Sequence, residues 1–254
     1  MLGNAVYKLM RVGIKIYLRC KYNIRVHNEC NLPPRDAFKK KGFIVACNHQ
    51  SYSDPPVIAG VISGRFAFMA KKELFQKSKP FAWLITACGA FPVDRGARDS
   101  SAIERSVKEL KKGRVFVIFP EGTRSKDGTI GRAKSGVALI AGSAGVPVLP
   151  MCIVYGADGD KRTVDVSVGK MIPAEEIAIV SDGELPDRAE LKRVSERILD
   201  SIKELQKRIL RSYGFSVYDI QRIAENYKNM KNEKNNKKEV KREINKETTK
   251  ESRG

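Results

Sequence analysis

Short apolar runs alternate with helical patterns along the middle of this sequence, and this alternation is the strongest constraint on its fold. Each run has the length of one strand, and polar turns or segments with helical spacing separate the runs. The apolar runs are Phe43–Cys47, Phe66–Ala70, Val115–Phe119, Val148–Val154 and Val164–Val168, and helical patterns include Ser101–Lys111 and Ser135–Gly142. Strands that alternate with helices predict an α/β fold with a mixed, largely parallel sheet flanked by helices.

A long amphipathic helical pattern follows the last apolar run. Apolar residues recur every three or four positions from Leu191 to Ile209, with Asp187 near the start and Gly214 just past the end, as expected of a capped helix. Beyond Tyr227 the sequence holds ten basic and five acidic residues and few apolar ones, which predicts a disordered or loosely helical tail. We therefore expect a basic, amphipathic helical segment over residues 1–39, an α/β domain over 40–215 and a basic tail over 216–254.

The sequence carries a large positive charge. Its 254 residues include 48 Lys and Arg against 29 Asp and Glu, a formal net charge of +19. This charge favours a polyanionic partner, namely nucleic acid, an anionic membrane surface or an acidic protein. Composition alone does not choose among the three.

The cysteines and the uncharged segments narrow the class of protein. The five cysteines are widely spaced and include no Cys-x-x-Cys pair, which predicts neither a disulfide framework nor a metal site and favours a reduced, cytosol-facing location. The longest uncharged run, residues 135–157, is long enough to span a bilayer, but its glycines and prolines favour a buried helix, a turn and a buried strand. We therefore predict no transmembrane helix, and basic residues interrupt the N-terminal apolar residues too early for a cleavable signal peptide.

Residues 2–20 show a basic amphipathic pattern. At 100° per residue, Lys8, Arg11, Lys15 and Arg19 fall within one stripe about 80° wide. Such a helix is typical of a segment that lies in a membrane interface. An ordinary helix that docks on the protein and leaves its basic face in water would show the same pattern.

His49 and Asp54 are five residues apart, and His49 is one of only two histidines. They lie between a predicted strand and Asp54-Pro55, a pair typical of a helix start with Asp as N-cap. In a regular helix, residues five apart point about 140° away from each other, so the two side chains can meet only across a turn. Asp54 would then hold one ring nitrogen and leave the other to accept a proton. Alternatively, Asp54 only caps the helix and His49 is a turn residue.

Two further segments carry groups suited to an anion. Residues 119–125 (Phe-Pro-Glu-Gly-Thr-Arg-Ser) follow a predicted strand, so backbone N–H groups near Gly122 and the guanidinium of Arg124 are placed to contact phosphate oxygens. Residues 91–95 (Phe-Pro-Val-Asp-Arg) place Arg95 in a turn beside Asp94. A local Asp–Arg ion pair explains the second segment equally well.

Four blocks of this sequence, taken in order, resemble the 1-acyl-sn-glycerol-3-phosphate acyltransferase (lysophosphatidic acid acyltransferase) family. The resemblance covers roughly residues 40–215, which makes this part the expected catalytic domain. Residues 48–54 match the family's His-x4-Asp block and residues 91–95 look like its second block. Residues 119–125 are similar to the third block and residues 146–150 to the fourth.

The resemblance implies a mechanism and a set of site residues. His49 would deprotonate the free hydroxyl of lysophosphatidic acid, Asp54 would orient His49, and the product would be phosphatidic acid, formed without an acyl-enzyme. By the same likeness, five residues would bind the glycerol-phosphate group of the acceptor: Arg95, Glu121, Gly122, Thr123 and Arg124. Pro147 would shape the substrate pocket, and Lys71 is placed near the phosphate by its charge and position only.

The resemblance also implies the partners. No cofactor is expected, because the acyl group arrives as a thioester on acyl carrier protein or coenzyme A. Since the acceptor is a lipid, we expect peripheral or monotopic binding to the cytoplasmic face of an anionic membrane through the basic N-terminal helix.

Three other interpretations are consistent with parts of the sequence. The acceptor could be another lysophospholipid or glycerol 3-phosphate, which the four blocks do not separate. A thioesterase or lipase could use the same His and Asp, but no Gly-x-Ser-x-Gly motif occurs. A basic nucleic-acid-binding protein would interleave aromatic with basic residues, whereas only 7% of residues are aromatic, so we expect no nucleic-acid partner.

Overall fold

The computed structural model describes residues 2–34, 37–38, 41–94, 100–125, 127–177 and 187–216. The chain divides into two compact units, Met1–Ile209 and Leu210–Gly254. Of the second unit, residues 210–216 are described, and they form the end of a helix and a turn at Gly214, whose φ is 83°. The tail predicted from residue 216 onward lies otherwise outside the described residues.

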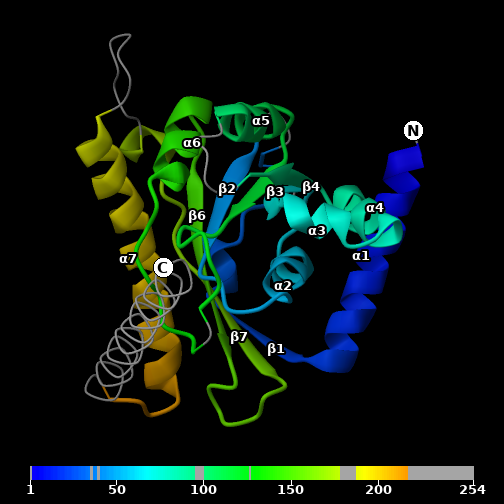
Figure 1. Cartoon of the computed structure of the whole chain (residues 1–254). Coiled ribbons are helices and arrows are strands. Elements are labelled where there is room, and N and C mark those ends of the chain that lie inside the picture. The colour runs from blue at the N-terminus through cyan, green and yellow to red at the C-terminus, as the bar shows by residue number, and fades with distance from the viewer. Residues whose placement is uncertain are drawn as a thin grey trace, which may run out of the picture. The chain divides into compact units, whose positions relative to one another are not determined.

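A seven-stranded sheet forms the centre of the first unit (Figure 1). The strand order is β1-β7-β6-β2-β5-β3-β4, and every neighbouring pair is parallel except β6 and β7. The predicted mixed, largely parallel sheet is therefore confirmed. The strands are β1 (Asn23–His27), β2 (Phe43–Cys47), β3 (Phe66–Lys71), β4 (Ala90–Val93), β5 (Val115–Ile118), β6 (Val148–Tyr155) and β7 (Thr163–Val168).

Helices cover both faces of the sheet. In Figure 1, α1 and α2 lie on one side, and α5, α6 and α7 lie on the other. The α-helices are α1 (Leu2–Lys21), α2 (Asp54–Val61), α3 (Lys72–Gln76), α4 (Lys79–Ala87), α5 (Ser100–Lys111), α6 (Gly136–Ala144) and α7 (Arg188–Ser212), with 3-10 turns η1 (Glu29–Asn31) and η2 (Ala174–Glu176). As predicted, α7 begins after Asp187, whose carboxylate accepts the Ala189 N–H at 3.2 Å, and Gly214 lies just past its end.

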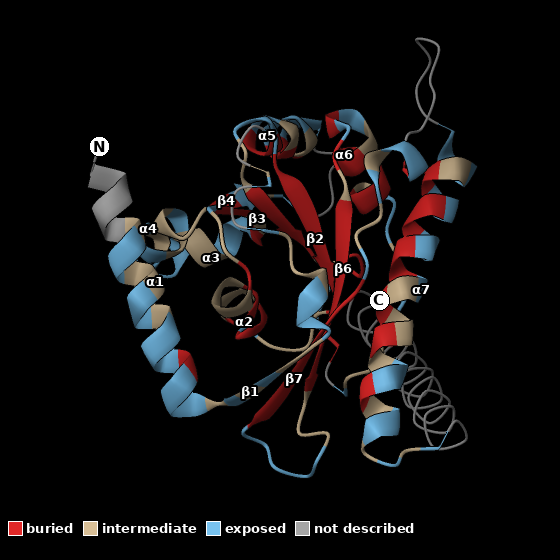
Figure 2. Cartoon of the chain, turned by 180° about the vertical axis from the view of Figure 1, so that it is seen from behind, coloured by how far each residue is buried: buried red, intermediate tan, exposed pale blue. Residues whose placement is uncertain are grey.

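Burial on both faces explains why the central strands are continuously apolar. All five residues of β2 are buried (Figure 2), as expected of a parallel strand covered by helices on each side. On the face toward α2, Val45 and Cys47 pack with Val57 and Ile58 in one core cluster. This packing fixes the direction in which the chain leaves β2 and enters α2.

Strand β1 lies inside the N-terminal segment that we expected to be helical. It pairs in parallel with β7, from Asn23 opposite Thr163 to His27 opposite Ser167. Only Ile24 and Val26 are apolar within it, because an edge strand has one neighbour and needs little apolar surface. Its alternating pattern is too short to distinguish it from a loop, and the sheet therefore starts earlier than residue 40.

Helix α1 docks on the body of the protein by one face and exposes apolar side chains on another. Tyr7 donates a hydrogen bond to the Gly64 carbonyl at 2.8 Å, and Leu18 is 3% exposed. The outward side chains of Leu9, Val12 and Ile16 are 74%, 53% and 58% exposed. Among the described helices, none is long and apolar enough to cross a membrane.

The basic stripe of α1 is also divided between these two environments. The Arg11 guanidinium donates to the backbone carbonyls of Ala59, Ile62 and Gly64 at 3.2–3.3 Å. Lys8, Lys15 and Arg19 are exposed. The alternative of a simple docking helix therefore accounts for the exposed basic side chains, but not for the exposed apolar side chains of Leu9, Val12 and Ile16.

Candidate active site

The candidate site lies at the carboxyl ends of β2 and β5, which are parallel neighbours in the sheet. Residues 48–54 follow β2, and residues 119–125 follow β5. Ligands of open α/β sheets bind outside the carboxyl ends of the strands. The topology therefore brings the His49 segment and the Arg124 segment to the same edge.

His49 and Asp54 are in direct contact across the turn between β2 and α2. His49 Nδ1 lies 2.7 Å from Asp54 Oδ2, and the two side chains are 14% and 0% exposed. The carboxylate therefore binds the inner ring nitrogen and fixes the ring. Within the described part of the chain, His49 Nε2 makes no hydrogen bond, so this nitrogen is open to a substrate.

Asp54 is held by four hydrogen-bond donors. Its Oδ2 accepts His49 Nδ1 and the backbone N–H groups of Gln50 and Ser51, at 2.7 and 2.8 Å, and its Oδ1 accepts the Tyr155 hydroxyl at 2.7 Å. The predicted N-cap was wrong by one residue, since Ser53 is the N-cap and Asp54 is the first residue of α2. In that position the carboxylate can accept the backbone N–H groups of Gln50 and Ser51 and also His49 Nδ1.

Tyr155 was missed by the sequence reasoning. It is the last residue of β6, the neighbour of β2 on the side away from β5. Burial raises the pKa of its hydroxyl well above the ordinary value, and the negative charge of Asp54 raises it further. Tyr155 therefore stays protonated and donates to Asp54. Its ring meets that of Tyr22 edge-on, with centroids 5.8 Å apart, and Tyr22 donates to Ser53 Oγ at 2.9 Å.

The segment after β5 wraps around His49 through three contacts. The Phe119 ring stacks on the imidazole, with centroids 3.9 Å apart and an interplanar angle of 14°. The backbone N–H of His49 donates to Glu121 Oε1 at 3.2 Å, and the backbone N–H of Ser125 donates to the His49 carbonyl at 2.7 Å. Backbone and ring of His49 are thus both fixed before any substrate binds.

Glu121 lies beneath this site rather than on its surface. Its residue is 8% exposed, and its second oxygen accepts the Gly131 N–H at 2.8 Å. Burial raises the pKa of this carboxyl, while the two N–H donors and His49 oppose the increase. We expected Glu121 to contact the acceptor, but its oxygens instead join the His49 turn to the loop containing Gly131.

The segment after β5 also has an exposed end, and this end is cationic. The Arg124 guanidinium lies over the Tyr52 ring, 3.6 Å from the centroid, and both residues are exposed. Thr123 is exposed beside it. Gly122 has a φ of 70°, which favours glycine, and the end of the Lys134 side chain lies close by, 2.8 Å from where a Cβ would be. Lys134 thereby adds a second cation, which the sequence alone did not distinguish from other lysines.

Two further predicted site residues, Lys71 and Pro147, lie at different distances from this centre. Lys71 is exposed at the end of β3, one strand beyond β5 and on the same sheet edge. Pro147 precedes β6, where its carbonyl accepts the Ile44 N–H, so it lies at the opposite end of β2, about 13 Å from the carboxyl edge along the strand. Arg95 lies outside the described residues. The structure thus does not bring Pro147 to the site.

The neighbouring cysteine is a core residue. Cys47 is fully buried at the end of β2, and burial holds the pKa of its thiol well above the ordinary value, which makes it a poor nucleophile. All five cysteines are free. In the parts of the chain that the structure describes, no group of three or more His, Cys, Asp or Glu side chains is arranged to hold a metal ion.

A histidine held by a buried aspartate, with one ring nitrogen open, is an arrangement that can perform acid–base chemistry, and the exposed loop nearby carries cations that can contact an anion. The Acyltransferase family model matches residues 23–154, a range that includes this entire His49–Arg124 arrangement. The chain therefore belongs to the acyltransferase family of enzymes, and the predicted family and α/β class are confirmed.

Three relatives make the assignment more specific. The 1-acyl-sn-glycerol-3-phosphate acyltransferase of Bacillus subtilis is 30% identical over 205 residues, which cover 80% of this chain and 98% of that protein. The enzyme of the same name from Streptococcus pneumoniae is 34% identical over 167 residues, or 63% and 60% of the two chains. The crystal structure of the 1-acyl-sn-glycerophosphate acyltransferase PlsC from Thermotoga maritima matches with a TM-score of 0.58 and 28% identity, covering 79% of this chain and 81% of that one.

Proposed function

We propose that the protein transfers a fatty acyl group from a thioester donor to the sn-2 hydroxyl of 1-acyl-sn-glycerol 3-phosphate, giving phosphatidic acid. One observation carries the proposal: His49 is held by Asp54 at 2.7 Å with its Nε2 open, and the loop that bonds to the His49 backbone carries the exposed guanidinium of Arg124. The names of the relatives from B. subtilis and S. pneumoniae support this acceptor.

The reaction requires a base but no covalent intermediate. His49 Nε2 takes the proton of the acceptor hydroxyl as the oxygen attacks the thioester carbonyl, and Asp54 stabilises the resulting imidazolium. The carbonyl carbon then releases the thiolate, which takes the proton back from Nε2. The new ester bond replaces the thioester bond, and His49 returns to its neutral form.

The phosphate of the acceptor binds the exposed cations of the loop after β5. Arg124 presents a planar fork that suits phosphate oxygens, and stacking on Tyr52 orients this fork. Lys134 lies beside Gly122 and adds positive charge, while Thr123 is exposed for a hydrogen bond. Arg95 and Lys71 remain candidates for the same anion, from their charge and position in the sequence.

The acceptor is reached from a membrane surface. The exposed side chains of Leu9, Val12 and Ile16 on α1, together with Lys8 and Lys15, form an apolar stripe beside basic residues, which suits the interface of an anionic bilayer. Trp83 on α4 is 60% exposed and adds an aromatic anchor. We place the protein on the cytoplasmic face as a peripheral or monotopic enzyme, with acyl-CoA or acyl carrier protein as the donor and no cofactor.

Mass spectrometry of the reaction products tests the transfer directly. Purified protein is incubated with 1-acyl-sn-glycerol 3-phosphate and either acyl-CoA or acyl carrier protein loaded with the same chain. We expect phosphatidic acid, and little acylation of glycerol 3-phosphate or of lysophosphatidylcholine. Preferred acylation of either control would reject the proposed acceptor, and release of free fatty acid alone would favour a hydrolase.

A vesicle sedimentation assay tests the membrane partner. The triple variant Leu9→Gln/Val12→Gln/Ile16→Gln should no longer sediment with anionic vesicles, because it loses the outward apolar stripe and keeps the docked face of α1. Complete deletion of residues 1–20 should have the same effect but also removes Tyr7 and Leu18 from the core. Undiminished sedimentation of both variants would exclude α1 as the membrane contact.

A further inference from the structure

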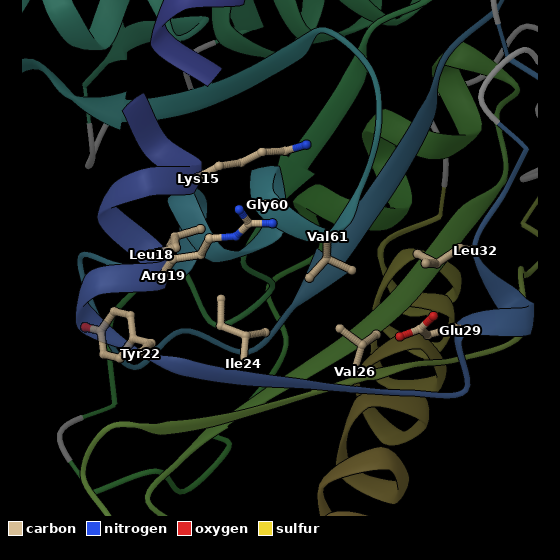
Figure 3. A pocket seen from close by; sticks show the side chains of 10 residues that line it. All are labelled: Lys15, Leu18, Arg19, Tyr22, Ile24, Val26, Glu29, Leu32, Gly60 and Val61. Carbon is tan, nitrogen blue, oxygen red and sulfur yellow. The ribbon is translucent and has the colours of Figure 1, made fainter. Parts of the chain in front are cut away.

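A cavity of about 420 Å³ lies between α1, β1 and the end of α2 (Figure 3). Its size is within the range of about 300–1,000 Å³ that is usual for small-molecule sites. Its lining residues are Lys15, Leu18, Arg19, Tyr22, Ile24, Val26, Glu29, Leu32, Gly60 and Val61. None of the residues assigned above to catalysis or to the acceptor lines it, so this cavity is separate from the candidate active site.

The wall of the cavity is built for a hydrocarbon chain. Ile24 and Val26 are two residues apart on β1, so their side chains project from the same face of the strand. Leu18, Val61 and Leu32 continue the apolar lining from α1 past α2 to the end of η1 (Figure 3). This elongated apolar surface suits an acyl chain rather than a compact polar ligand.

Gly60 allows the two helices to approach closely enough to form this wall. A Cβ at Gly60 would lie 2.7 Å from Leu18 Cδ1, closer than carbon atoms normally pack. A side chain here would push Leu18 into the cavity. The glycine therefore keeps open the space that an acyl chain would occupy.

Two cations lie at the α1 end of the cavity. Lys15 and Arg19 are one turn apart on the helix, an arrangement of like charges that is unfavourable on its own. Two other basic residues of α1 already have hydrogen-bond partners: Arg11 donates to three carbonyls, and Lys21 donates to the Tyr17 hydroxyl at 2.7 Å. Within the described residues, Lys15 and Arg19 have no hydrogen bond or ion pair, so both are available to an anion.

The charged residues also determine which way round an anionic lipid would lie in the cavity. Glu29 lies beside Leu32, at the end away from Lys15 and Arg19 (Figure 3). Its carboxylate repels an anionic head group at that end, whereas Lys15 and Arg19 attract one at the other. A lipid would therefore place its phosphate near α1 and extend its chain along β1.

We propose that this cavity is a second lipid site, which binds an anionic phospholipid of the membrane with one acyl chain along the apolar wall and the phosphate on Lys15 and Arg19. The site takes a bound lipid rather than a substrate, because its lining residues include neither His49 nor Asp54. The cavity residue Tyr22 connects to Asp54 indirectly, through Ser53 and Tyr155. The site goes beyond the proposed catalytic function and requires no turnover.

Binding of a short-chain lipid tests this site. The sequence has one tryptophan, so the variant Trp83→Phe/Leu32→Trp places the sole tryptophan in the cavity. Titration with dihexanoyl phosphatidic acid, kept below its micelle concentration, should give a saturable change in fluorescence. Adding Lys15→Gln/Arg19→Gln should weaken this binding about tenfold or more, because two charge-assisted contacts are lost. Adding Lys8→Gln, which removes an exposed charge of α1 outside the cavity, should change the affinity less than about twofold.

Native mass spectrometry gives a second measurement without a tryptophan in the cavity. In the His49→Ala background, the chain should bind one phosphatidic acid fewer when Lys15→Gln/Arg19→Gln is present, and the same number when Lys8→Gln is present. The proposal is overturned if dihexanoyl phosphatidylcholine or inorganic phosphate binds equally well, or if Lys8→Gln weakens binding as much as the double variant. Product formation is measured separately, so loss of this site and failure of the catalytic proposal are distinguishable.

Discussion

Both histidines of this chain contact a fully buried aspartate at the same distance, and only one of the two pairs is placed for catalysis. His49 Nδ1 lies 2.7 Å from Asp54 Oδ2, and His27 Nε2 lies 2.7 Å from Asp165 Oδ1. Both aspartates have side chains that are 0% exposed. A short His–Asp distance is therefore not sufficient evidence for an active site.

The two pairs differ in which ring nitrogen is bound and in what surrounds the ring. His49 is bound through Nδ1, stacked on Phe119 and 14% exposed, with Nε2 open at the carboxyl edge of the sheet. His27 is bound through Nε2, is 36% exposed, and joins the edge strand β1 to β7. The first pair is therefore the one that fits the proposed general base, and the second connects an edge strand to its neighbour.

The largest expected effect comes from removing the imidazole of each pair in turn. We expect His49→Ala to lower kcat/KM by about 10³-fold or more, within the range for a lost general base. His27→Ala should leave kcat/KM within about twofold and lower the free energy of unfolding by about 1–3 kcal/mol, because buried Asp165 loses a partner. Steady-state kinetics and urea unfolding measure the two quantities. Equal losses of activity in both variants would abolish the distinction between the pairs.

The aspartates should show the same contrast with a smaller effect on activity. Asp54→Asn keeps the volume but removes the charge that stabilises the imidazolium, so we expect kcat to fall by about 10²–10³-fold. Asp165→Asn, the matched variant, should retain kcat and lower only stability. If kcat of Asp54→Asn stayed near that of the wild type, Asp54 would be a structural residue of the α2 start, as its alternative interpretation states.

Tyr155 distinguishes the first pair further, because its hydroxyl donates to Asp54. Tyr155→Phe should lower kcat by about tenfold, since a hydrogen bond to a charged group contributes about 1.5–3 kcal/mol. The loss should fall on kcat, because the carboxylate that orients His49 loses one of its hydrogen-bond donors. The acceptor KM should change little, which separates this positioning role from binding.

Tyr22→Phe is the control for Tyr155. The Tyr22 hydroxyl donates to Ser53 and not to Asp54, so kcat of this variant should match that of the wild type. An equal loss of kcat in both variants would mean that the two rings act only by packing against each other.

The sequence predicted those parts of the site whose residues are neighbours in the chain or belong to one motif. Periodicity was sufficient for the largely parallel sheet and for α7, because continuous apolar runs and long amphipathic spacing are strong signals. The turn between strand and helix correctly implied that His49 and Asp54 could meet. The cationic loop with Arg124 was found from its glycine and its position after a strand.

The contacts that complete the site could not be predicted in the same way. Tyr155 reaches Asp54 only because β6 is the spatial neighbour of β2, and strand order is not encoded in local spacing. Glu121 was assigned to the acceptor by the family likeness alone, whereas tertiary contacts bury it under His49. Pro147 was placed near the site by its motif, although it begins the strand whose other end reaches Asp54.

The smallest expected effect concerns Glu121, which accepts the backbone N–H of His49. Burial raises its pKa above the ordinary 4.5, so the folded state holds this proton more tightly than the unfolded state. Stability should therefore fall as pH rises from 4.5 through the folded-state pKa. Glu121→Gln cannot ionise, so its free energy of unfolding should improve relative to the wild type across this window. Glu190→Gln is the control: its surface partner Arg193 lowers the carboxyl pKa, and the opposite sign is expected. A wild-type stability that rises with pH relative to Glu121→Gln would show that the two N–H donors outweigh burial.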